Sequence, residues 1–124
     1  MISQMFFYLG GALSIVWGVA HLFPTKSVVA GFGDISADNR HIITMEWIVE
    51  GVALIFIGVL VVVITLVDRE SSAAEVVYLT SASGLVVLAL VSLFTGFKVN
   101  FLPFKLCPFI FSASAALLLL GVLL

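Results

Sequence analysis

The sequence has few charged residues and a single cysteine. Asp, Glu, Lys and Arg make up 10% of its 124 residues, whereas soluble domains carry roughly 25%. The net charge is −2, and the basic face that nucleic-acid binding requires is missing. Because Cys107 stands alone, the chain has no internal disulfide, no Cys-x-x-Cys redox pair and no metal site built from several of its own thiolates.

The sequence is rich in long apolar segments. Hydrophobic residues account for 63% of it, more apolar surface than a soluble fold of this size can bury. Only helices or closed barrels satisfy the backbone in lipid, and no alternating pattern indicates a barrel. We therefore predict an all-α integral membrane protein, with residues 1–124 forming one transmembrane domain, an antiparallel four-helix bundle. Its spans, each near or above the roughly 20 residues that a bilayer requires, are 4–23, 42–67, 75–96 and 104–124.

Small residues recur every four positions in the first span, at Gly10, Ser14 and Gly18. This spacing lets two helix backbones approach closely. We expect a helix contact there, either within the bundle or between two copies of the chain in a homo-oligomer. Ser36, in the connection that follows, is an expected N-cap.

The basic residues indicate how the chain is oriented. Four of the five lie in or beside the connections 24–40 and 97–104, and Arg69 alone lies at the other end. The positive-inside rule therefore predicts that these two connections are cytoplasmic and that both termini are outside. We expect a bacterial inner (plasma) membrane, whose lipids are the first partners of the chain.

Two carboxylates interrupt the second span, at Glu46 and Glu50. Four residues apart on a helix, they share one face, and acids within a span usually point into the protein. We expect Glu46 to be ionised and paired, and the deeper Glu50 to be protonated at least in part. His21, Trp47 and Lys105 fall at the same end of the predicted bundle. The five residues predict a polar pocket for a small ligand, a lipid headgroup or a cation; a purely structural hydrogen-bond network is the alternative.

A metal is a weaker alternative for the same end of the bundle, with His21, His41 and Glu46 as candidate ligands. No His-x3-His spacing is present, and on one ideal helix His41 points about 140° away from Glu46. Haem held by the two histidines is weaker still. The sequence leaves the cofactor and any enzymatic activity open.

Several short stretches resemble a known group of proteins. They are Gly-Val-Ala-His-Leu-Phe-Pro at 18–24, Asn-Arg-His at 39–41 and Met-Glu-Trp-Ile-Val-Glu-Gly at 45–51. Together with the four spans they resemble DoxX-like proteins and related small bacterial membrane proteins. The resemblance carries over no catalytic residue. It implies a membrane subunit of a quinone-linked redox system as one alternative function.

Proton-coupled transport is the other alternative, because small multidrug-resistance transporters are similar in size and also carry a membrane glutamate. Their glutamate lies in the first helix, however, whereas Glu46 and Glu50 lie in the second span. Vitamin K epoxide reductase-like proteins fit less well, since they need a Cys-x-x-Cys pair.

Overall fold

The computed structural model describes all 124 residues and contains helices but no strand. Four helices are long and apolar enough to cross a membrane, which confirms the predicted all-α four-helix bundle of a small membrane protein. They are α1 (Ile2–Leu22), α3 (Ala37–Asp68), α4 (Ser72–Phe94) and α5 (Leu102–Leu123). The connections hold two shorter helices, α2 (Thr25–Ala30) and the 3-10 helix η1 (Gly96–Lys98).

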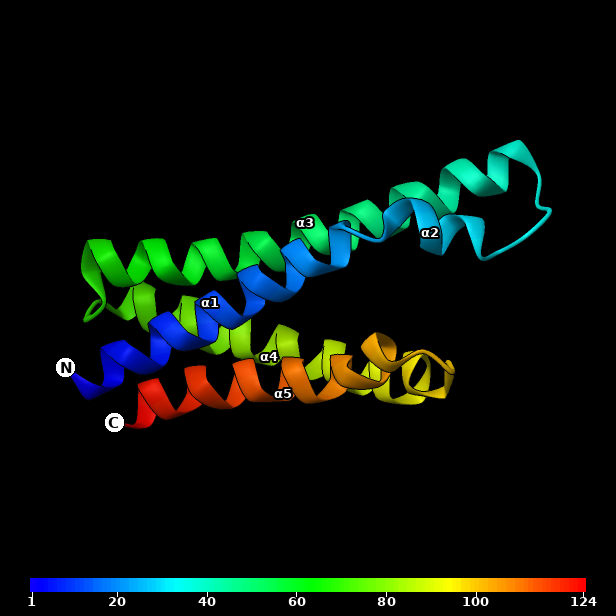
Figure 1. Ribbon diagram of the computed structural model, residues 1–124. Coiled ribbons are helices and arrows are strands. Elements are labelled where there is room, and N and C mark those ends of the chain that lie inside the picture. The colour runs from blue at the N-terminus through cyan, green and yellow to red at the C-terminus, as the bar shows by residue number, and fades with distance from the viewer.

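The helices run up and down the bundle, with both termini and the α3–α4 turn at one end (Figure 1). At the other end, α2 and the beginning of α3 project beyond α4 and α5 (Figure 1). α1 packs along α3 and α5, and α4 packs along α5. α3 and α4 share few contacts although they follow one another in the chain. α1 is therefore the helix that joins the two halves of the bundle.

Small residues fill much of the interior, while many large apolar side chains face outward on all four long helices. This distribution suits lipid, where helices associate through close packing because the lipid tails are as apolar as leucine. Gly10, Ser14 and Gly18 are all buried. A Cβ atom on Gly18 would lie 2.8 Å from the carbonyl oxygen of Gly51 in α3. The close helix contact expected at these residues is thus made inside one chain.

Buried hydroxyl groups tie the helices together beside these close contacts. The Ser14 hydroxyl donates to a carbonyl of α3 at 2.8 Å, and the Ser114 hydroxyl donates to the carbonyl of Gly10 at 2.8 Å. The hydroxyls of Thr65 and Tyr78 lie 2.8 Å apart and link α3 to α4. No buried side-chain nitrogen or oxygen lacks a partner. The buried interior therefore offers a ligand no unpaired side-chain polar group.

The connection 24–40 is more ordered than the expected loop, because α2 occupies part of it. Ser36 is the N-cap, as predicted, and its hydroxyl accepts from the Asn39 amide at 3.1 Å. The cap starts α3 at Ala37, before the expected start of the second span at residue 42. With 32 residues, α3 is about 48 Å long, longer than the hydrocarbon core of roughly 30 Å. The first turns of α3 can therefore extend beyond the hydrocarbon core.

Candidate functional site: an aromatic pocket at the end of α1

The end of α1 is fastened to α3 by a pair of reciprocal hydrogen bonds between His21 and Trp47. The His21 carbonyl is one of the last four of the helix, which have no partner within it, and the Trp47 indole N–H donates to it at 2.8 Å. In return, His21 Nε2 lies 3.0 Å from the Trp47 carbonyl oxygen. The two rings stack, with centroids 3.9 Å apart and an angle of 18° between their planes. We call these two hydrogen bonds and the stacked rings the clamp; together they fix the orientation of both side chains.

Glu50 lies one turn beyond Trp47 on α3, and its carboxylate oxygen is 3.5 Å from His21 Nε2. The His21 side chain is only 7% exposed, whereas that of Glu50 is 46% exposed. Glu46 is also exposed and makes no ion pair. Both acids therefore differ from the expectation that they point into the bundle, and the partner expected for Glu46 is found by Glu50 instead, as a contact with the His21 ring.

The length of α3 gives a physical reason for the exposed acids. Glu50 and Asp68 are separated by a stretch without charged residues, 51–67, whose one polar side chain is Thr65, and lie about 27 Å apart along the helix. This separation is close to the thickness of the hydrocarbon core. Both charges can therefore lie at opposite edges of the core. Glu50 was expected to lie deeper in the membrane because the second span was predicted to start at residue 42.

A pocket of about 340 Å³ opens beside the clamp, between the end of α1, α3 and the start of α5. Both tryptophans of the chain contribute to its wall. A wider groove of about 720 Å³, which also borders α2, shares several residues with it. We call the smaller cavity the aromatic pocket. The main ring-bearing and polar residues of its wall are Trp17, His21, Trp47, Phe101, Phe104 and Cys107.

The glutamates line a different cavity. Glu46 and Glu50 border a groove of about 340 Å³ together with Phe32 and Trp47. Trp47 lines both cavities, so its side chain lies between the carboxylates and the aromatic pocket. The polar site expected from the sequence is therefore divided: His21 and Trp47 belong to the aromatic pocket, and the two acids belong to the groove.

The remaining candidates lie in neither cavity. The Lys105 ammonium group donates to the Phe97 carbonyl at 2.8 Å and lies 5.0 Å from the centre of the Phe97 ring. His41 is exposed in the second turn of α3. No group of three or more His, Cys, Asp and Glu side chains is arranged to hold a metal ion. The weaker candidates His21, His41 and Glu46 are thus not gathered into a coordination site.

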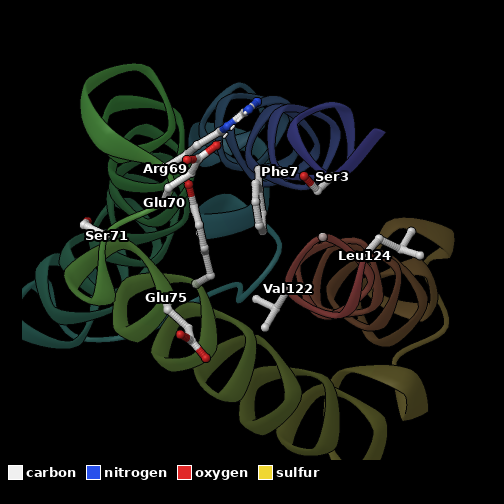
Figure 2. Close-up of a pocket in the computed structure, with 10 residues that line it drawn as sticks. Ser3, Phe7, Arg69, Glu70, Ser71, Glu75, Val122 and Leu124 are labelled. Carbon is white, nitrogen blue, oxygen red and sulfur yellow. Dashed lines mark hydrogen bonds and ion pairs between the residues drawn. The ribbon is translucent and has the colours of Figure 1, made fainter. Parts of the chain in front are cut away.

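A second, polar cavity of about 290 Å³ lies at the opposite end, beside the termini. Figure 2 shows Arg69, Glu70 and Glu75 around it, with Phe7 beside Arg69 and Glu70 and above Glu75 in this view. Arg69 is already engaged, because it donates to Gln4 at 2.6 Å and to Glu70 at 3.2 Å. The sequence presents these charges as a simple polar turn. The structure shows that they surround a hollow whose one basic residue, Arg69, is hydrogen-bonded to both Gln4 and Glu70.

Four residues of the aromatic pocket were not among the site residues predicted from the sequence: Trp17, Phe101, Phe104 and Cys107. The sequence does contain a hint of this site, because aromatic residues are concentrated where the first predicted span ends and the last one begins. The same concentration is typical of the aromatic belt at a membrane surface. Their convergence depends on the fold, which brings the start of α5 against the end of α1.

Comparison of the chain with models of protein families, with curated proteins and with solved structures finds no match. The resemblance to DoxX-like proteins is therefore unsupported.

Proposed function

We propose that this small membrane protein binds a lipophilic small molecule with a flat ring in the aromatic pocket. The observation that supports the proposal is the composition of the wall. Trp17, Trp47, Phe101 and Phe104 surround the space, and apart from them only His21 and Cys107 bring side chains with polar atoms to it. Ligand pockets generally have volumes of about 300–1,000 Å³ and combine apolar walls with a few well-placed polar groups.

The position of the pocket favours a ligand that reaches it from the membrane. The pocket lies beside Glu50, close to the edge of the hydrocarbon core, and continues into the wider apolar groove along α2. A molecule with a ring and an aliphatic tail can place the ring among the aromatic side chains and the tail along this groove. Aromatic rings gain about 0.5–1.5 kcal/mol from stacked or edge-on contacts beyond the area that they bury.

The geometry favours this function over a polar pocket for a cation or a lipid headgroup. Both carboxylates lie outside the aromatic pocket. For the same reason it gives little support to proton-coupled transport, which needs a titrating acid on the path of the substrate. A quinone-linked redox role is compatible with a flat-ring ligand but requires a partner protein as well.

The two tryptophans give a direct test, because both line the pocket and the chain has no others. Purified protein in mild detergent would be titrated with decylubiquinone, whose ring quenches indole emission at short range. We expect saturable quenching. In parallel, bound decylubiquinone should slow the alkylation of Cys107 by N-ethylmaleimide, followed by mass spectrometry.

A matched pair of variants separates binding in the pocket from partition into the detergent. Ala20 lines the pocket, whereas Ala12 is exposed on the same helix and lines none of the cavities described. Ala20→Phe should abolish the saturable quenching by filling the pocket, and Ala12→Phe should leave it unchanged. Quenching that is linear in decylubiquinone, or identical in the two variants, would refute the proposal.

A further inference from the structure

We infer that the aromatic pocket selects rings that carry a hydrogen-bond-donating hydroxyl group, as phenols and hydroquinones do, and that His21 Nδ1 is the acceptor. The inference rests on the proposed function and names the chemical class of ligand for the same pocket. It follows from the partners of the two nitrogen atoms of the His21 ring.

The surroundings of Nε2 determine where the ring holds its proton. Nε2 lies 3.0 Å from the carbonyl oxygen of Trp47 and 3.5 Å from a carboxylate oxygen of Glu50. A backbone carbonyl oxygen can only accept, and so can an ionised carboxylate. Nε2 therefore carries the proton and donates it. A neutral imidazole with its proton on Nε2 has a free lone pair on Nδ1, which makes Nδ1 an acceptor.

The surroundings of Nδ1 leave this acceptor available. Nδ1 makes no hydrogen bond within the chain, and no buried side-chain nitrogen lacks a partner, so Nδ1 keeps some accessible surface. The side chain as a whole is 7% exposed, and one face of the ring is covered by Trp47. The cavity that His21 lines is the aromatic pocket. An almost fully buried side chain thus presents an unused acceptor to an apolar space, where a donor from a ligand has little competition from water.

The other polar groups of the wall do not supply an equivalent acceptor. The indole N–H of Trp17 is a donor only, and the sulfur of Cys107 is a weak acceptor whose thiol lies 3.4 Å from the Pro103 carbonyl. The rivals are the carbonyls of Ala20 and Phe104, both of which line the pocket, because Pro24 and Pro108, each four residues on, have no N–H to offer them. A test has to separate these carbonyls from His21.

The first experiment compares two probes, 4-hexylphenol and its methyl ether 4-hexylanisole, in which a methyl group replaces the donor hydrogen. Each would displace decylubiquinone from the wild-type protein, with recovery of tryptophan emission as the readout. One net hydrogen bond predicts a preference of about 3- to 10-fold for the phenol. Equal displacement by the two probes would overturn the inference while leaving the proposed function intact. Failure of decylubiquinone to bind at all would remove the proposed function.

Two variants then assign the acceptor. His21→Phe keeps a ring to stack on Trp47 but removes Nδ1, so the two probes should displace decylubiquinone equally well. Trp17→Phe removes the indole donor that lies one turn before His21 on α1 and should keep the preference for the phenol. If the preference persists in His21→Phe, the acceptor is another group, such as the Phe104 carbonyl, and the inference is wrong.

A measurement on the wild-type protein does not depend on how a variant folds. The chain has two histidines, His21 and the exposed His41, so nitrogen NMR of protein labelled at histidine gives a simple spectrum with an internal control. His21 should carry its proton on Nε2, and its Nδ1 resonance should shift with 4-hexylphenol but not with 4-hexylanisole. The His41 resonances should stay in place. A proton on Nδ1 in the unliganded protein, with or without one on Nε2, would overturn the inference.

Discussion

Substitution of a single glycine in α1 tests whether the close approach of α1 to α3 holds the site in place. A Cβ atom on Gly18 would lie 2.8 Å from the Gly51 carbonyl oxygen, 2.8 Å from Cγ1 of Ile55 and 2.9 Å from the Ile55 amide nitrogen. Two of these atoms belong to the backbone and cannot rotate away. Gly18→Ala should therefore push α1 and α3 apart, one turn from His21.

The magnitude follows from a comparison with Gly84 in α4, where an added Cβ meets nothing within 4 Å. Replacing a helical glycine by alanine gains about 0.5–1 kcal/mol from the backbone alone, and this gain is common to both variants. Gly84→Ala should show the gain. Gly18→Ala should in addition suffer an overpacking cost of about 1–3 kcal/mol. The difference between the two variants thus measures the contact itself.

The assay is reversible unfolding of both variants and the wild type by sodium dodecyl sulfate in the same mild detergent, followed by circular dichroism. Gly18→Ala should be less stable than Gly84→Ala by the amount given above. Its tryptophan emission should also change, because Trp47 loses part of its clamp. If the two variants have equal stability, α1 and α3 are not in close backbone contact and the geometry of the site is wrong.

Three further predictions concern the groove, the interior and the orientation. Glu50→Gln should cost at most about 1 kcal/mol in thermal unfolding, because the Glu50 carboxylate that contacts His21 is half-exposed and such contacts are weak, and Glu46→Gln should cost nothing measurable; a larger loss for Glu46→Gln would contradict the observed contact. Ser114→Ala should cost about 0.6 kcal/mol, and up to about 1.7, in detergent unfolding, the range for interhelical hydrogen bonds in membranes; no loss at all would mean that its bond to α1 is not formed. In a cysteine-free background, a cysteine at Ser36 should be shielded from impermeant label added outside the cell and one at Ser71 should react; the reverse result would invert the predicted orientation.

The sequence was sufficient to predict the four spanning helices, because lipid allows few other solutions for so apolar a chain. It also identified the N-cap at Ser36 and the packing role of Gly18, since both depend on local spacing. It did not predict where the acids point. Whether Glu50 faces a neighbouring helix or the surface depends on the rotation of α3, which is set by its contact with α1 and not by its own sequence.

The site itself was harder to predict, because its parts come from distant segments. His21 and Trp47 could be named as site residues, but their reciprocal hydrogen bonds need the exact register of α1 against α3. That register is fixed two turns or less away, where Gly18 meets Gly51. A one-residue slip of either helix would rotate His21 by about 100° and break both bonds. The packing of glycines and the chemistry of the pocket are therefore one feature of the structure.

The excess length of α3 has a role in the same arrangement. If α3 began at the edge of the hydrocarbon core, near Glu50, it would lack Trp47, whose indole N–H caps the His21 carbonyl of α1. The early start at Ala37 adds about three turns before Trp47, and α2 packs against α3. With the segment around Phe101, these elements border the wider groove next to the aromatic pocket. α2 and the beginning of α3, which project beyond α4 and α5 (Figure 1), thus extend the pocket wall outward. A bundle of four equally long helices would end before this wall and could not enclose a ring there.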